Sequence, residues 1–172
     1  MNLFADLLAS TQTPSATSTG PRIQKRRGVE IKSAREIKIM REASRIVATV
    51  LREVMAMVEP GQTTGELDAF AEKRIREMGA TPSFKGYHGF PASICASINN
   101  EVVHGIPNAK RVIHKGDLLK VDTGAYFEGY HGDSCITVCV GESSAEAQTL
   151  SRVAQESLMA GLSQVKAGNT LL

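Results

Sequence analysis

The stretch VDTGAYFEGYHGD, residues 121–133, decides how this chain folds, because it places a tight turn between two alternating segments. Glu128-Gly129 is a two-residue connection that ends in glycine, which is a common way of joining antiparallel strands. Residues 118–127 and 130–140 are therefore predicted to form a hairpin. Any even turn length gives the same division of side chains between the two faces, whereas an odd length inverts one strand.

The predicted register puts Asp122 and Asp133 on one face of the hairpin. Asp122 faces Cys135 and Gly124 faces Asp133, and strand side chains alternate between faces with a period of two. The two carboxylates are then diagonal neighbours, about 7 Å apart at the backbone. The opposite face, which we expect to pack on helices, gathers the apolar side chains Leu119, Val121, Ala125, Phe127, Ile136, Val138 and Val140. His131 is expected on this apolar face in a structural role.

Two carboxylates this close repel each other unless a cation or a proton lies between them. A shared proton would make an acid/base dyad, and ion pairs to Lys120 or an arginine would make the arrangement purely structural. A divalent metal would use both carboxylates as oxygen ligands. The metal is favoured because both aspartates lie outside the turn and on one face. Two aspartates cannot complete a coordination shell, so further ligands must come from elsewhere.

Helices are predicted on either side of this sheet region. Ser33 with Glu36 forms a capping box, and the apolar residues after it recur at helical spacing from Ile37 to Val58. A second helix is predicted from Thr63 to Gly79, and a third begins at Ser143-Ser144 and runs to Val165. Between them the chain reads as sheet and loop, with strands expected at 93–98, 101–103, 118–127 and 130–140.

A weak internal echo links two helix ends. Val58-Glu59-Pro60-Gly61-Gln62-Thr63 and Val165-Lys166-Ala167-Gly168-Asn169-Thr170 share three identities at a constant offset. Taken alone, the similarity fits chance resemblance between two helix ends. A true repeat would make this chain one copy and the beginning of a second.

The composition limits the class of protein to which this chain can belong. The chain has 172 residues, 42% hydrophobic content and a net charge of +2, as expected for one globular domain. No apolar run approaches the length of a membrane span, and three cysteines without a C-x-x-C pair favour a reduced, cytoplasmic protein. Residues 1–28 read as a flexible polar and basic tail before a folded domain at 29–172. Its basic cluster at 22–27 suggests ribosome contact only as a minority interpretation, and no specific nucleic acid is expected.

Longer motifs carry a family resemblance. GYHGFPASICASIN at 86–99, SINNEVVHGIPN at 97–108 and GDLLKVDTGAYFEGYHGDSCITVCVG at 116–141 resemble the signature region of type I methionine aminopeptidases. The resemblance covers about residues 30–172. It implies an α+β fold of the pita-bread (creatinase/aminopeptidase-like) type, here its N-terminal half and the start of the second pseudo-repeat. It also implies removal of the initiator methionine from nascent polypeptides.

The resemblance assigns roles position by position. Asp122 and Asp133 match metal ligands, and Asp133 matches the ligand that bridges two divalent ions, among which Co, Mn, Fe and Zn are not distinguished. His104 matches a catalytic histidine that contacts substrate, and the remaining expected substrate-binding residues are Tyr87, His88, Phe90 and Cys95. A methionine pocket with aromatic walls and a thiol suits an unbranched thioether.

The resemblance also exposes what this sequence lacks. The family needs one histidine and two glutamates as further metal ligands, and no residue after Thr137 fits them. The chain therefore reads as a truncated aminopeptidase that we expect to be inactive alone. The alternatives are a naturally shortened, inactive form, a prolidase-like peptidase of the same superfold, and a non-catalytic binding module.

Overall fold

The computed structural model describes residues 30–170 of the chain. The expected tail at 1–28 therefore lies outside the described residues. Within them the order of elements is two helices, a four-stranded sheet with one short 3-10 turn, and a final helix. These are α2 (Ala34–Met57), α3 (Thr64–Glu77), β1 (Thr81–Pro82), η1 (Tyr87–Gly89), β2 (Ile94–Ile98), β3 (Leu118–Phe127), β4 (Tyr130–Cys139) and α4 (Ala145–Ser163).

Capping boxes define where α2 and α3 begin. The Ser33 side chain accepts a hydrogen bond from the Glu36 N–H, and the Glu36 carboxylate accepts one from the Ser33 N–H. Thr63 and Glu66 make the same reciprocal arrangement at the start of α3. Both arrangements satisfy N–H groups that have no partner inside the helix. The predicted helix starts are thus confirmed, although Ile37 is 46% exposed rather than part of the inner face of α2.

The hairpin has the predicted register. Asp122 is the partner of Cys135 and Gly124 is the partner of Asp133 in the β3–β4 ladder. β2 pairs with the other side of β3, where Cys95 is the partner of Asp122. β1 pairs with the end of β3, so β2 is an edge strand. The strand expected at 101–103 is not formed, since these residues belong to an extended loop after β2.

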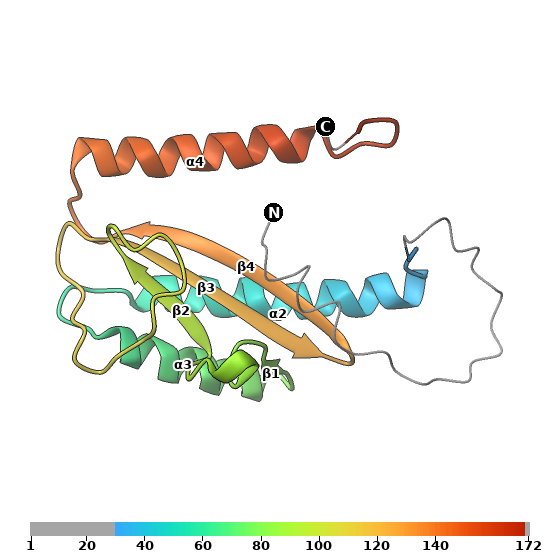
Figure 1. The fold of residues 1–172 in the computed structure, drawn as a ribbon, viewed down its shortest axis with the longest axis horizontal. Helices are drawn as coiled ribbons and strands as arrows, with labels where there is room; N and C mark the ends of the chain where they lie inside the picture. Colours follow the sequence, from blue (N-terminus) through green and yellow to red (C-terminus); the bar gives the residue numbers. More distant parts are fainter. Residues whose placement is uncertain (1–29, 171–172) are drawn as a thin grey trace.

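The two faces of the sheet differ in cover and in chemistry. The helix face, which is the face of β2–β4 that packs on α2 and α3 (Figure 1), carries Ile94, Ala96, Leu119, Val121 and Ala125, all fully buried. These residues form one core with the buried stripes of both helices, which include Ile46, Val50, Val54, Leu67 and Ile75. The aspartate face, defined as the opposite face that carries Asp122 and Asp133, is free of either helix.

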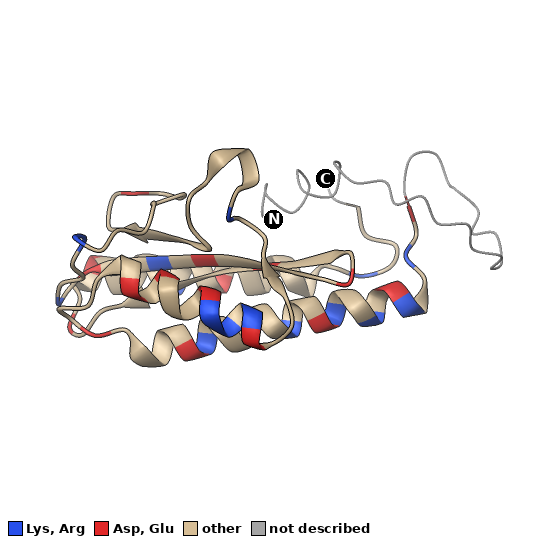
Figure 2. Ribbon diagram, turned by 90° about the horizontal axis from the view of Figure 1, so that it is seen from below, with Lys and Arg blue, Asp and Glu red and all other residues tan. Residues whose placement is uncertain are grey.

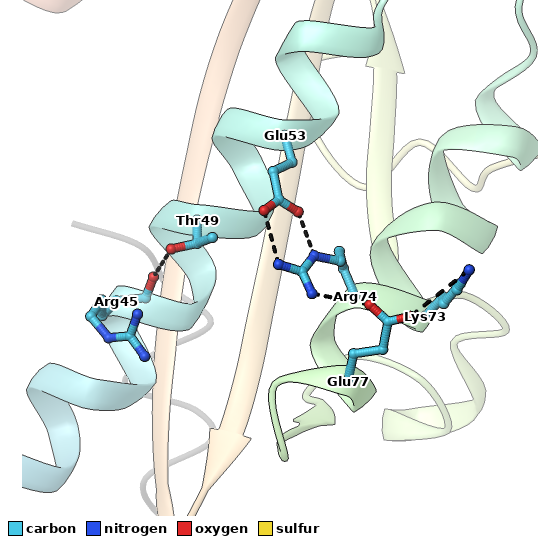
Figure 3. Close-up of polar contacts among 6 residues, drawn as sticks. All are labelled: Arg45, Thr49, Glu53, Lys73, Arg74 and Glu77. Atoms are coloured by element: carbon cyan, nitrogen blue, oxygen red, sulfur yellow. Dashed lines mark hydrogen bonds and ion pairs between the residues drawn. The ribbon is translucent and has the colours of Figure 1, made fainter.

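Ion pairs add to the contact between the two helices. Arg74 of α3 donates from Nε and Nη2 to the two carboxylate oxygens of Glu53 in α2, at 2.6 and 3.0 Å (Figure 3). Its Nη1 reaches Glu77 in its own helix at 3.0 Å. Positions of Lys, Arg, Asp and Glu recur along the helices in Figure 2. Because Arg74 and Glu53 are each about one-third exposed, this two-point contact orients the helices more than it stabilises the fold.

The last helix, α4, lies apart from the sheet (Figure 1) and buries none of its residues. Its predicted apolar stripe is present but remains exposed, with Leu150, Val153, Leu158 and Leu162 between 48% and 62% accessible. The core that positions the aspartates is therefore built without α4.

None of the helices in residues 30–170 combines the length and the apolar character that a membrane span requires.

The structure supports the internal echo after the first and third helices. Gly61 and Gly168 have nearly the same left-handed φ, +98° and +95°. The Gln62 N–H donates to Glu59 O, and at the same offset the Asn169 N–H donates to Lys166 O. A turn with matching backbone and hydrogen bonding follows α2 and α4, as expected for a repeated unit.

Candidate metal centre

The aspartate face is organised in cross-strand rows. One row runs from Cys95 on β2 through Asp122 on β3 to Cys135 on β4. The next row holds Gly124 and Asp133, so the two carboxylates are diagonal neighbours, as predicted. Both aspartates are half-buried, and one oxygen of each, Oδ1 of Asp122 and Oδ2 of Asp133, is buried from solvent. Two acidic groups thus converge on one small area of sheet.

The pKa values of the neighbouring cysteine thiols are raised in part by the charges of both aspartates. Burial, and then the charge of Asp122, raises the pKa of Cys95 to about 12, with Cys135 and Asp133 contributing in the same direction. Cys135 is exposed as a residue, but partial burial of its thiol raises its pKa to about 11, again with both carboxylates contributing. The thiols therefore stay protonated at neutral pH. Carboxylate oxygens that share one sheet face are the ligands that hard divalent cations prefer.

Lys120 is held one row away from Asp122. Its ammonium donates to the backbone carbonyl of Asn99 at 2.6 Å, and burial lowers its pKa. Lys120 is therefore engaged at the loop after β2. This placement weakens the interpretation in which Lys120 neutralises Asp122 in a purely structural ion pair.

His104 lies beside the outer edge of β2. It follows the extended loop, is exposed and has a left-handed φ of +59°. Gly105 next to it is fixed to β2, since its N–H donates to Ser97 Oγ at 2.9 Å and its carbonyl accepts from the Ala96 N–H at 2.8 Å. A Cβ at Gly105 would come within 2.4 Å of Ala96 O, so only glycine permits this approach. The loop is therefore pinned with His104 one strand away from β3 and Asp122.

The expected pocket residues form two groups. Cys95 is buried in the row of Asp122, whereas Tyr87, His88 and Phe90 belong to the η1 loop between β1 and β2, which rises on the side of the sheet opposite the two helices (Figure 2). Phe84 is buried at the base of this loop. His88 is exposed, and its ring meets that of Tyr87 edge-on at 4.3 Å.

Gly124 explains why the η1 loop can cover the aspartate face. A Cβ at Gly124 would lie 2.9 Å from both Phe84 Cε1 and Ser83 Cβ. Ser83 also donates its N–H to Gly124 O at 2.9 Å. The loop is thus seated on the strand position that faces Asp133.

The face predicted for His131 was wrong, although its contacts fit the expected structural role. His131 is the partner of Tyr126, with ring centroids 4.8 Å apart, and shares the face of Asp133 two residues further on. The glycine that follows it, Gly132, instead faces α2. His131 Nδ1 lies 2.9 Å from Ser83 Oγ, and burial lowers its pKa. It helps to hold the η1 loop, and neither its spacing nor its residue type indicates this particular partner.

The donor set fits a divalent metal in part. Hard divalent ions prefer carboxylate oxygens, and both aspartates offer these from one rigid ladder. Within residues 30–170, however, no group of three or more histidine, cysteine, aspartate or glutamate side chains is placed to hold a metal ion. The described residues therefore supply two ligands to a centre that needs more.

Comparison with known proteins identifies the class. Residues 38–172 match metallopeptidase family M24, and the chain belongs to that family. Methionine aminopeptidase 1 of Mycobacterium tuberculosis is 49% identical over 150 residues, which are 87% of this chain and 56% of that protein. The chain thus spans about half the length of the curated relatives it matches.

Solved structures agree on the fold. The methionine aminopeptidase of Thermotoga maritima superposes with a TM-score of 0.78 at 36% identity, covering 80% of this chain and 55% of that one. An Xaa-Pro dipeptidase of Bacillus anthracis gives 0.71 at 31% identity, covering 81% and 38%. These neighbours share the pita-bread fold, and the predicted α+β class is confirmed. Family membership implies use of a divalent metal.

Proposed function

We propose that this chain carries part of the active site of a metal-dependent methionine aminopeptidase, which removes the initiator methionine from nascent polypeptides. The observation that carries the proposal is the placement of Asp122 and Asp133 on one sheet face in adjoining rows. The similarity to methionine aminopeptidases at 49% identity supports this substrate over X-Pro peptides. A cytoplasmic location fits the three free cysteines.

Each residue has a proposed part in the reaction. Asp122 and Asp133 would hold two divalent ions, and Mn, Fe, Co and Zn remain candidates. Such ions acidify a water molecule and polarise the scissile carbonyl when bound. His104 would donate a hydrogen bond to the carbonyl or the tetrahedral intermediate, and Tyr87, His88, Phe90 and Cys95 would contact the methionine end of the substrate. The ribosome contact through residues 22–27 concerns residues outside the described range and stays a prediction.

Metal binding tests the carboxylates directly. Calorimetric titration of the full chain with Mn²⁺ should show weak binding, because the described residues supply only two ligands. Asp122→Asn or Asp133→Asn should each weaken it at least about tenfold, because each removes a charged oxygen donor. Glu128→Gln, in the exposed hairpin turn, is the matched control and should bind as the unaltered chain does. Equal Mn²⁺ affinity in all four proteins would contradict the proposed metal centre.

Peptidase activity tests the reaction. The 172-residue chain with Mn²⁺ or Co²⁺ should release negligible methionine from a Met-Gly-Met peptide. Residues 30–172 joined to the segment of the M. tuberculosis relative that the match does not cover should release it, and Asp122→Asn in that chimera should abolish release. A chimera that cleaves X-Pro dipeptides in preference would instead support the prolidase-like function. No observation among residues 30–170 favours a non-catalytic binding module.

A further inference from the structure

Asp68 connects α3 to the beginning of β2. Its Oδ1 accepts hydrogen bonds from the backbone N–H groups of Ser93 at 2.8 Å and Ile94 at 3.0 Å. Both of these residues are fully buried. A carboxylate that accepts two buried N–H groups replaces partners that the backbone would otherwise lack.

The outer edge of β2 shows why such an acceptor is needed. Because β2 is an edge strand, its outward N–H groups have no neighbouring strand. Three of them find acceptors of other kinds: Ile94 uses Asp68 Oδ1, Ala96 uses the Gly105 carbonyl, and Ile98 uses Glu101 Oε2. Asp68 thus holds the start of β2, directly before Cys95.

We infer that Asp68 is a positioning residue, whose carboxylate oxygen fixes the start of β2 and so keeps the Cys95 thiol in the row of Asp122. The functional meaning of this position rests on the proposed function, in which Cys95 forms a wall of the substrate pocket. Cys95 is only 2% exposed and directly precedes Ala96, whose N–H is bound to Gly105. Ile94 and Cys95 also pair with Thr123 and Asp122 of β3, so loss of the Asp68 contact would loosen the outer side of segment 93–95 and leave the rest of β2 attached.

Burial of Asp68 is consistent with this role. Burial raises the pKa of its carboxyl group, and the two N–H groups of Ser93 and Ile94 oppose that shift. Asp68 is also the smallest named contributor to the negative potential at Cys95. Removing its charge alone should hardly change the Cys95 thiol, whereas removing its oxygen should expose that thiol.

Alkylation of the full chain by iodoacetamide, resolved by mass spectrometry for each cysteine, tests the inference. Asp68→Ala should accelerate modification of Cys95 at least about tenfold, because two buried N–H groups lose their acceptor and the strand end opens. Asp68→Asn should stay within about threefold of the unaltered chain, since an amide oxygen still accepts both bonds. The exposed Cys135 serves as an internal reference and should react alike in all variants.

Glu101→Ala is the matched control, because it removes a carboxylate acceptor from the other end of the same strand. It should leave the Cys95 rate within about twofold of the unaltered chain. The inference is overturned if Asp68→Ala leaves Cys95 as slow as before, or if Glu101→Ala accelerates it equally. Should Asp68→Ala unfold the chain, so that all three cysteines react fast, Asp68→Asn decides: retained protection supports the inference and lost protection overturns it. Neither metal nor turnover enters this readout, so it can fail independently of the proposed function.

Discussion

At the scale of single residues, Gly132 sets how closely α2 lies on the hairpin. A Cβ built there would lie 2.5 Å from both Ala43 C and Ala43 O, which are backbone atoms that cannot move aside. Gly132→Ala should therefore lower the free energy of unfolding in urea by about 1–3 kcal/mol. Gly161→Ala, in α4, meets no atom within 4 Å and should leave stability unchanged or raise it by up to about 1 kcal/mol. Equal effects of the two substitutions would contradict a close helix–hairpin contact.

Single residues also show what the sequence could and could not predict about the site. Alternation along two strands and an even turn were enough to place Asp122 and Asp133 on one face. The same alternation assigns His131 to that face, because it lies two residues from Asp133 on one strand. Its predicted place among the apolar side chains is therefore wrong. Asp68 gives no comparable signal, because its contact with β2 bridges 25 residues and depends on how α3 packs. Local patterns specify the direction of a side chain, whereas partners distant in sequence follow from the tertiary fold.

At the scale of elements, a carboxylate joins the first turn of α2 to the hairpin. Glu36 accepts from the Ser33 N–H at 2.6 Å and from Tyr130 Oη at 2.7 Å. The Ser33 bonds, and then that of Tyr130, lower the pKa of Glu36 from 4.5 to about 2. Because the folded pKa is the lower one, this stabilisation is present above about pH 4.5 and is lost as the pH falls towards 2.

Glu36→Gln should accordingly lower the thermal midpoint at neutral pH, and the difference from the unaltered chain should narrow steadily in acid. Tyr130→Phe is the companion variant, because it removes one bond and keeps the capping box. Thermal unfolding followed by circular dichroism from pH 7 to pH 3 measures both differences. A difference between Glu36→Gln and the unaltered chain that does not vary with pH would show that the charge of Glu36 contributes nothing.

Elements with strong local signals were predicted well, and the others were not. Capping boxes and helical spacing located α2 and α3 to within two residues. By contrast, Val102 and Val103 have the β-branched side chains typical of strands yet are 80% and 61% exposed in a loop. Their intrinsic preference has no effect there, because Gly105 already occupies the open edge of β2. The short strand β1 is not predicted from the sequence, because proline, here Pro82, is unusual in a strand.

At the scale of the whole molecule, the core and α4 are energetically separate. α4 buries no residue, so Leu158→Lys should change the free energy of unfolding by no more than about 0.5 kcal/mol. It should also reduce binding of the apolar dye ANS, since Leu158 is 57% exposed on the apolar stripe. Leu119→Ala, at a fully buried position of β3, should by comparison cost about 2–5 kcal/mol. A large destabilisation by Leu158→Lys would show that α4 packs against the core in solution.

The paired ladder of β3 and β4 also constrains how this protein can change over evolutionary time. Between Asp122 and Asp133 the ladder is continuous, with no bulge to absorb an additional residue. A single-codon insertion or deletion in the part of either strand between these two residues would turn one carboxylate to the apolar face, whereas a two-codon event would preserve the orientation of both. Natural length variation in this ribbon should therefore occur in even steps.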